Sequence, residues 1–355
     1  MSALDILVGK SAAAHLSKHG WRGRDISLLL GASGGPKWLI LGELDRVLSS
    51  KFLFLDREQT LLALGSSVGS WRHALMGMKD PHAAYDRFQE IYLSYEYPTK
   101  PSIDEVSEAS YVMLEHVFEQ NGVAEILENR DFQGYIVTAR GRGLASSQRK
   151  LPLAVGMGAG ALGNALHRRF LAGAFQRVVF ASERAPKIFL KGFETTQVPL
   201  TSATLIPALH ASGSIPFVLA GERDIPGGPK GHYWDGGIID YHFKLEELSR
   251  LAGEGLVLYP HFRSDITPGW FDKFLPWRRL APTALDSIIL MAPSKEFVAS
   301  LPMEKIPDRT DFTKLSPEQR RAYWRSCIER SKELALAFSA LVDGPDPLAG
   351  VRILN

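Results

Sequence analysis

Short apolar runs recur along the chain, and between them apolar residues return at helical spacing. A short, mostly apolar run bounded by glycine or polar residues indicates a buried strand. Such runs occupy residues 26–30, 61–64, 134–139, 177–180, 256–259 and 287–291. Helical spacing occupies residues 11–19, 38–48, 71–78, 82–128 in two amphipathic segments, 208–216 and 317–342. Strands that alternate with helices are typical of an α/β protein.

The most apolar stretch of the chain, residues 151–165, contains Gly156, Gly158, Gly160 and Gly163. This G-x-G-x-G-x-x-G spacing is compatible with a dinucleotide-binding turn, because Glu183 follows at about the distance of a ribose-binding acid. That interpretation requires a strand–helix–strand unit that begins near residue 151. The interpretation we favour is a glycine- and alanine-rich helix that packs closely against the protein or lies on lipid.

The composition is that of an ordinary globular protein, with 45% hydrophobic and 23% charged residues in 355. A net charge of only +2 provides no electrostatic argument for a nucleic-acid partner. Cys327 is the lone cysteine, which excludes an intramolecular disulfide and a cysteine-based metal site. We therefore predict no metal, no cofactor and no nucleic acid among the ligands.

The length allows one large α/β domain or two modest ones, and no stretch is long enough to serve as a linker. We predict a single domain over residues 1–355. Asp5 interrupts the first apolar stretch and no small-residue cleavage site follows it, so this segment does not match a signal peptide. No apolar run reaches the roughly 18–20 residues of a membrane span. We predict a cytoplasmic protein without a transmembrane segment and leave a peripheral place at a membrane open.

Residues 65–69 form the first candidate for chemistry. Their sequence, G-S-S-V-G, follows the apolar run 61–64 and matches G-x-S-x-G with Ser67 at the centre. In this pattern a strand turns sharply into a helix and exposes the serine hydroxyl as a nucleophile. Glycine is needed on both sides because a side chain there would collide across so tight a turn.

A second glycine-rich turn, residues 31–37, links the predicted strand 26–30 to a helix. Its Ser33, Gly34 and Gly35 can present backbone N–H groups to an anion at a helix start. Lys37 follows them, but the next residue is Trp38, so the G-K-[ST] of a phosphate-binding loop is absent. The alternative is a tight turn that merely needs glycine.

A third mark is Asp235, which is followed by two glycines after an aromatic run at 233–234. We expect this carboxylate at a strand end where backbone packs closely, although Asp-Gly-Gly alone is most often a turn.

The three marks, in this order, resemble the patatin-like phospholipases. That family has a glycine-rich oxyanion loop, then G-x-S-x-G, then an Asp-Gly-Gly aspartate, and residues 211–216 look like its Ala-Ser-x-x-x-Pro turn. The resemblance covers about residues 25–245 and leaves 246–355 unassigned. It implies a three-layer α/β/α sandwich with a mostly parallel central sheet. Two residues depart from the family pattern: Lys37 replaces the usual arginine, and Val68 follows the serine where a smaller residue is commoner.

The resemblance implies a lipid acyl hydrolase of the phospholipase, lysophospholipase or carboxylesterase type with a Ser–Asp dyad. Ser67 would be the nucleophile and Asp235 the general base, which requires burial to raise the carboxyl pKa. The loop 33–35 would hold the oxyanion, with Lys37 and Val68 beside it. Pro36 has no N–H to contribute.

Two other hypotheses remain open at this stage. The first is a conventional α/β-hydrolase triad, since the order Ser67, Asp235 and then His242 or His261 satisfies it. The second is a nucleotide- or lipid-binding module that uses the glycine turns without hydrolysis. The sequence does not distinguish phospholipid from neutral ester substrates, and it does not establish acyl-chain preference, the oligomer or the role of Lys37.

Overall fold

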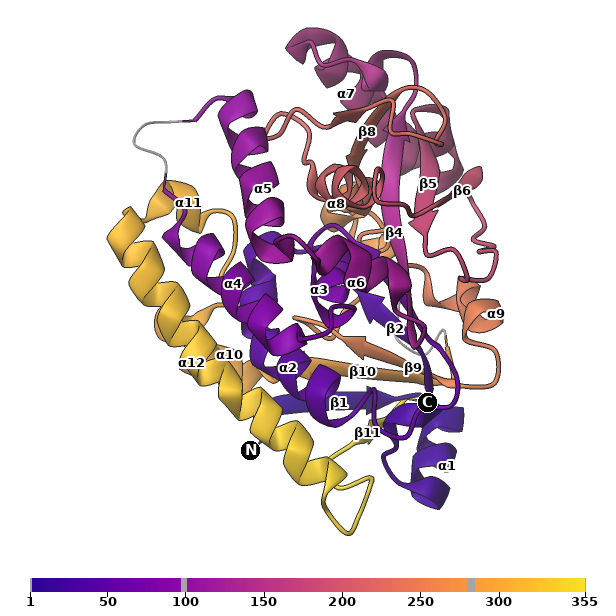
Figure 1. Ribbon diagram of the computed structural model, residues 1–355, viewed down its shortest axis with the longest axis vertical. Helices are drawn as coiled ribbons and strands as arrows, with labels where there is room; N and C mark the ends of the chain where they lie inside the picture. Colours follow the sequence, from indigo (N-terminus) through magenta and orange to yellow (C-terminus); the bar gives the residue numbers. More distant parts are fainter. Residues whose placement is uncertain (1, 97–100, 280–284, 355) are drawn as a thin grey trace.

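The computed structural model of the protein describes residues 2–96, 101–279 and 285–354 (Figure 1). A sheet forms its centre, with the strand order β11-β1-β10-β9-β2-β3-β4-β5-β6, and β4 also pairs with β8, which pairs with β7. The strands are β1 (Leu4–Val8), β2 (Ile26–Gly31), β3 (Leu61–Ser66), β4 (Phe132–Gly141), β5 (Phe175–Ala181), β6 (Thr195–Pro199), β7 (Glu222–Arg223), β8 (His232–Asp235), β9 (Leu256–Pro260), β10 (Ile288–Pro293) and β11 (Arg352–Ile353).

The sheet is mostly parallel, as predicted. Neighbours from β10 through β9, β2 and β3 to β4 are all parallel, and antiparallel pairs join β1 to β10 and β4 to both β5 and β8. All six predicted strands are present. The sequence does not predict β1, the two-residue strands β7 and β11, or β6, a strand at one end of the sheet path whose Thr195-Thr196-Gln197 run is polar.

Helices surround this sheet. They are α1 (Lys10–His19), α2 (Gly42–Lys51), α3 (Val68–Met76), α4 (Pro81–Ser94), α5 (Ile103–Phe118), α6 (Gly122–Glu128), α7 (Lys150–Leu166), α8 (Leu205–Gly213), α9 (Ser249–Ala252), α10 (Lys295–Ser300), α11 (Asp311–Lys314) and α12 (Pro317–Val342). Figure 1 shows α2, α4 and α12 packed together along one side of the molecule. The bounds of α12 are those predicted, because Ser316 and Gln319 form a capping box around Pro317.

Four predicted helices differ from the structure. The one expected over residues 208–216 is α8, Leu205–Gly213. The helix expected after the first glycine turn is divided into a 3-10 helix, η2 (Gly35–Ile40), and α2. The helix expected from residue 71 begins at Val68, directly after the candidate nucleophile. The segment 82–128 contains three helices, and Glu119, with φ 49°, ends the second of them.

The dinucleotide-binding interpretation of residues 151–165 is wrong. These residues lie within the single helix α7, and a short 3-10 turn at Gly143–Ser146 precedes it where a strand would be needed. Gly156 serves helix packing instead: a Cβ there would lie 2.4 Å from the backbone nitrogen of Ala145.

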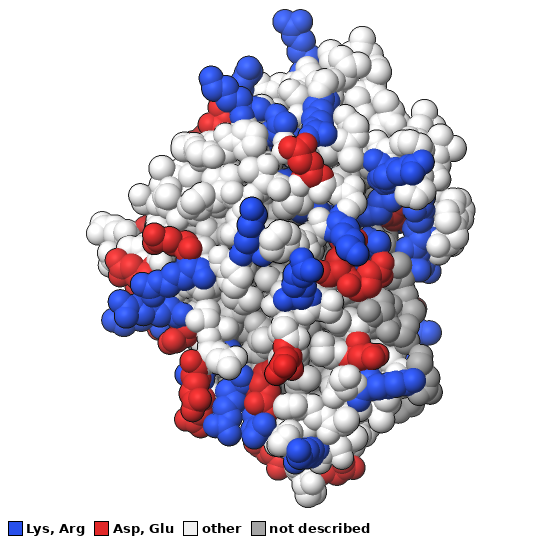
Figure 2. All heavy atoms as spheres, turned by 90° about the vertical axis from the view of Figure 1, so that its right-hand side faces the viewer, with Lys and Arg blue, Asp and Glu red and all other residues white. Residues whose placement is uncertain are grey.

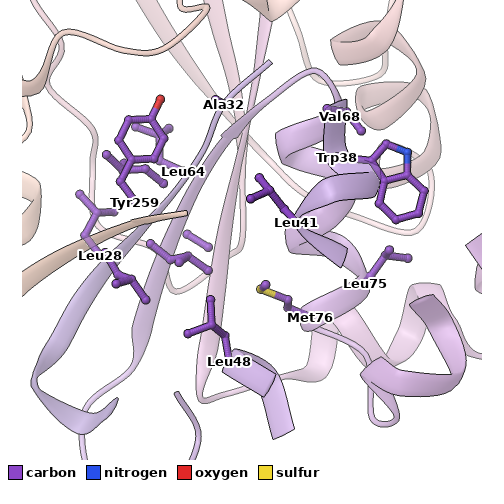
Figure 3. Packing of buried hydrophobic residues seen from close by; sticks show 14 of the residues in the cluster. Leu28, Ala32, Trp38, Leu41, Leu48, Leu64, Val68, Leu75, Met76 and Tyr259 are labelled. Carbon is purple, nitrogen blue, oxygen red and sulfur yellow. The ribbon is translucent and has the colours of Figure 1, made fainter. Parts of the chain in front are cut away.

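A continuous apolar core holds α2 and α3 against the sheet. In Figure 3, Leu41 and Met76 project toward the sheet from the helical side, while Leu28 and Leu64 lie on the opposite face of the sheet, and all four belong to one buried cluster. All four side chains are buried, and burial of a leucine or methionine contributes about 1.5–3 kcal/mol. This packing fixes the start of α3, and therefore Ser67, relative to the sheet.

A buried ion pair adds a polar link among these helices. The Arg72 guanidinium on α3 donates two hydrogen bonds of 2.6 Å to the Asp45 carboxylate on α2. The Tyr85 hydroxyl on α4 donates to the same carboxylate at 3.0 Å. Breaking such a pair from one side leaves an unpaired buried charge, which costs about 3–5 kcal/mol.

The chain beyond residue 245 is an integral part of the sheet. Strand β9 lies between β10 and β2, and residues of β9, β10 and α12 belong to the same buried core as β2 and β3. The segment without an assigned counterpart therefore supports the strands that carry the candidate site.

Candidate active site

Ser67 occupies a strained turn between β3 and α3. Its φ of 56° and ψ of −133° place it in a region that residues with side chains rarely adopt. The flanking glycines are required by close contacts: a Cβ on Gly65 would lie 2.6 Å from Ser70 Cα, and one on Gly69 would lie 2.1 Å from the Gly31 carbonyl oxygen. These contacts are the geometry expected of a nucleophile elbow.

The backbone of Ser67 is held by a residue from α8. The Ser67 N–H donates to Ser212 Oγ at 2.9 Å, and the Ser212 hydroxyl donates to the Val137 carbonyl at 2.7 Å. Ser212 belongs to the turn at 211–216 that carried part of the resemblance. Its contact with the elbow is a role that the sequence did not specify.

Strand β4 brings Ser67 and Asp235 together. In the register of the sheet, Ser66 of β3 pairs with Val137 of β4 in parallel, and the next residue, Thr138, pairs with Asp235 of β8 in antiparallel. Ser67, which directly follows the end of β3, and Asp235, which ends β8, therefore lie at neighbouring positions of the sheet. The Ser67 hydroxyl donates to Asp235 Oδ2 at 2.8 Å, and both side chains are buried.

The other contacts of Asp235 orient its carboxylate. Gly237 N–H donates to Oδ1 at 2.7 Å, and the Asp235 N–H donates to the Ser214 carbonyl at 2.8 Å. Neither glycine after the aspartate has room for a side chain. A Cβ on Gly236 would lie 2.2 Å from the Val137 carbonyl oxygen, and one on Gly237 would lie 2.6 Å from Ser33 Oγ.

Burial raises the pKa of Asp235 to about 6. Hydrogen bonds from Ser67 and Gly237 and the positive charges of Arg309 and Lys273 act in the opposite direction, but they do not offset the loss of hydration. A carboxylate with a pKa near 6 is ionised at neutral pH and is a far better proton acceptor than an ordinary aspartate.

The histidines of the alternative triad have other partners. His242 Nδ1 accepts from the Thr267 N–H at 2.9 Å, and His261 Nδ1 accepts from the Arg263 N–H at 3.0 Å. Burial lowers the pKa of His242 well below its ordinary value and that of His261 to about 3. Among the described residues that line the pocket at Ser67 there is no histidine.

The loop that was expected to hold the oxyanion lies at the pocket, but one of its N–H groups already has a partner in the protein. Ser33, Gly34, Gly35 and Lys37 all line the pocket beside Ser67. The Ser33 N–H, however, donates to the Tyr241 carbonyl at 3.0 Å, so it is not available to a substrate. Its hydroxyl donates to Ser66 Oγ at 3.0 Å. The donors that this loop can offer are therefore the N–H groups of Gly34 and Gly35.

Val68, which was expected beside the oxyanion loop, begins α3 directly after Ser67. It is the first residue of α3, where an N–H has no partner within the helix. Its side chain is buried in the apolar core, and Val68 is not one of the described residues that line the pocket.

Three basic side chains line the pocket, and the sequence identified only Lys37. Lys273 and Arg309 come from the segment beyond residue 245, which contains no motif that would have indicated them. Burial, together with the charges of Arg309 and Lys37, lowers the pKa of Lys273 to about 7. Burial also lowers the pKa of Lys37, whose Nζ lies 5.6 Å from the centre of the Phe262 ring.

The remaining pocket wall is largely apolar. Its side chains are Ile215, Pro216, Ile238, Tyr241 and Trp270. The pocket thus presents a serine–aspartate pair, two free loop N–H groups, three basic side chains and an apolar wall. This set of groups can bind an ester that combines an apolar chain with an anionic group, and it can transfer an acyl group to the serine.

Comparison with known proteins identifies no relative: no family model, no curated protein and no solved structure matches the chain. Within residues 2–96, 101–279 and 285–354, no helix is both long and apolar enough to cross a membrane. The same residues contain no group of three or more His, Cys, Asp or Glu side chains that could hold a metal ion.

Proposed function

We propose that this protein is a serine acyl hydrolase that cleaves acyl esters of lipids with a Ser67–Asp235 dyad. The observation that carries the proposal is the 2.8 Å hydrogen bond from the Ser67 hydroxyl to the Asp235 carboxylate, made at an elbow with φ 56°. A serine hydroxyl needs a base in direct contact to become a nucleophile, and this carboxylate is such a base.

In the proposed reaction, Ser67 Oγ attacks the ester carbonyl carbon while its proton passes to Asp235 Oδ2. The resulting oxyanion accepts hydrogen bonds from the N–H groups of Gly34 and Gly35. Collapse of the tetrahedral intermediate breaks the ester bond, and Asp235 returns the proton to the leaving alkoxide. Water then attacks the acyl-enzyme by the same route, which releases the fatty acid and restores the serine.

The lining of the pocket favours a phospholipid-type substrate over a neutral ester. Lys37, Lys273 and Arg309 can bind a phosphate near the reacting carbonyl, and Ile215 and Trp270 provide apolar surface for an acyl chain. The order of the three sequence motifs, similar to that of patatin-like phospholipases, supports the same assignment.

A fluorophosphonate probe tests the proposal directly, because it reacts covalently with activated serines. We expect the wild-type protein to be labelled and Ser67→Ala to lose labelling. Ser70→Ala, which removes a neighbouring hydroxyl in the first turn of α3, is the matched control and should keep it. Labelling that persists in Ser67→Ala, or a wild-type protein that neither reacts nor hydrolyses any lipid ester in a panel of phospholipids, lysophospholipids and glycerides, would contradict the proposal.

A further inference from the structure

The outward face of α7 is entirely apolar. The exposed residues of the helix after Lys150 recur at intervals of three and four, so they lie on one face. They are Leu151, Ala154, Val155, Gly158, Ala159, Leu162, Ala165 and Leu166. The opposite face packs into the protein through residues that include Leu153, Met157 and Asn164. A surface helix of a soluble protein ordinarily places polar residues on its outer face.

The degree of exposure makes this face unusual. Leu162 is 72% exposed and Leu166 is 79% exposed, and no polar side chain lies between them on that face. Contiguous apolar surface of this kind marks a site of interaction with another molecule. At about 1.5 Å per residue, the 17 residues of α7 span about 25 Å, which is shorter than the roughly 30 Å hydrocarbon core of a bilayer.

Two exposed aromatic side chains lie next to α7 on the segment η7–η8, Trp270–Arg278. Phe274 is 83% exposed and Trp277 is 71% exposed. Hydrogen bonds join this segment to the helix: the Asn164 amide donates to Asp272 Oδ1 at 2.6 Å, and Arg278 donates to the Asn164 carbonyl at 3.1 Å. The aromatic residues and the α7 face therefore belong to one connected part of the surface.

The same segment forms part of the candidate active site. Trp270 and Lys273 line the pocket at Ser67, and Phe274 and Trp277 follow them directly in sequence. A surface that bound to α7 and to these aromatics would thus lie beside the pocket.

The charge of this region is complementary to an anionic surface. Residues 132–182 contain no Asp or Glu. Arg149 and Lys150 are exposed at the start of α7, and Arg169 is exposed just after its end. Figure 1 places α7 at the upper end of the molecule, and in Figure 2 that end shows mainly uncharged and basic side chains. Basic side chains that flank an apolar helix face, with aromatic residues beside it, are typical of helices that lie in the interface of a membrane.

We propose that α7, together with Phe274 and Trp277, docks on an anionic lipid bilayer, with the helix lying in the plane of the membrane surface. Arg149, Lys150 and Arg169 would contact the anionic headgroups. The docking itself does not depend on catalysis. That it presents lipid esters to the pocket rests on the proposed function.

Vesicle sedimentation tests the docking, with Ser67→Ala protein so that lipid turnover cannot influence the result. The probes are vesicles of phosphatidylcholine mixed with phosphatidylglycerol, and vesicles of phosphatidylcholine alone. We expect binding to the mixed vesicles that weakens with added salt and is much weaker on phosphatidylcholine alone. Leu162→Glu should lower the partition coefficient at least tenfold, since burial of a leucine is worth that much or more.

Trp277→Ala gives a second, independent measurement on the other half of the patch and should also lower binding. Leu336→Glu is the matched control, because Leu336 on α12 is 68% exposed and lies on a different helix. It should bind as the parent does. Circular dichroism of each variant verifies that it is folded.

Three outcomes would overturn the proposal. The first is a parent protein that does not bind the mixed vesicles. The second is equal loss of binding in the Leu162 and Leu336 variants. The third is a dimer in the absence of lipid that Leu162→Glu converts to a monomer, which would assign the apolar face to a second copy of the chain. Failure of the proposed hydrolysis would be seen separately, as a wild-type protein that binds vesicles without cleaving their lipids.

Discussion

Replacing Asp235 by asparagine should inactivate the protein and stabilise it. The carboxylate is buried, and burial raises its pKa from an ordinary 3.8 to about 6. The folded state therefore prefers the neutral acid. The contribution of this preference to stability is fully present below pH 3.8 and is lost as the pH rises through about 6. Two pH units at about 1.4 kcal/mol each amount to about 3 kcal/mol of stability that is absent at neutral pH.

Asparagine is neutral at every pH, so the variant does not lose that contribution. Its side-chain oxygen can still accept the Gly237 N–H, and its amide can donate to Ser67 Oγ. At pH 7–8 we expect the free energy of unfolding of Asp235→Asn to exceed that of the wild type by about 1–3 kcal/mol. The difference should decrease to near zero at about pH 4. Turnover should fall on the order of 10³-fold, as when a member of a catalytic triad is lost.

Chemical denaturation of both proteins at a series of pH values measures this difference. Wild-type kcat/KM, followed in parallel, should rise with pH and reach half its maximum near the pKa of the buried carboxyl, about 6. Asp45→Asn is the control, since it makes the same chemical change in a buried carboxylate that pairs with Arg72. It should destabilise by about 3–5 kcal/mol. An Asp235→Asn protein that is less stable than the wild type at pH 8, or a difference that does not change with pH, would refute the reasoning.

Five other substitutions have expected outcomes. His242→Gln and His261→Gln should each reduce turnover far less than loss of the aspartate, because both Nδ1 atoms accept from backbone N–H groups; a loss as large in either variant would favour a triad. Lys37→Met should lower phospholipid hydrolysis by about tenfold and spare an uncharged nitrophenyl ester, since a charge-assisted hydrogen bond is worth about 1.5–3 kcal/mol; equal losses on both substrates would indicate a role in loop shape. Gly69→Ala should lower the melting temperature, because its Cβ would lie 2.1 Å from a carbonyl oxygen, whereas Gly158→Ala meets open space within its helix and should stabilise by up to about 1 kcal/mol. The opposite order of these two melting temperatures would show that the elbow is looser than its contacts indicate.

The local features of the site could be predicted from sequence because they depend on neighbouring residues. The turn at Ser67 needs glycine two residues away on both sides, and the aspartate needs two glycines after it. The predicted strands were apolar runs, so their burial was visible in the sequence. Strand β6 was missed because it ends the sheet path and its residues are polar.

The long-range features of the pocket could not be predicted in the same way. Lys273 and Arg309 reach the pocket only through the packing of segments that contain no motif. The Ser33 N–H was expected to face a substrate, but it donates to the Tyr241 carbonyl, a contact between residues about 200 positions apart. Such a bond follows from the path of the chain after β8, which no local pattern encodes. The patatin-like identity itself remains a prediction.

The position of β9 between β10 and β2 has a consequence for synthesis of the protein on the ribosome. Strand β3 ends at Ser66 and β9 begins at Leu256, about 190 residues later. At about 5–20 residues per second, translation of that interval takes roughly 10–40 s. During this time one edge of β2 has no strand to pair with, and the emerging chain already contains the apolar face of α7. The nascent protein therefore contains the serine and the aspartate before β9 is available to pair with β2 and before Lys273 can reach the pocket. We expect nascent chains released before β9 to be inactive and to require a chaperone, and activity to arise only after the chain through Arg309 has been made.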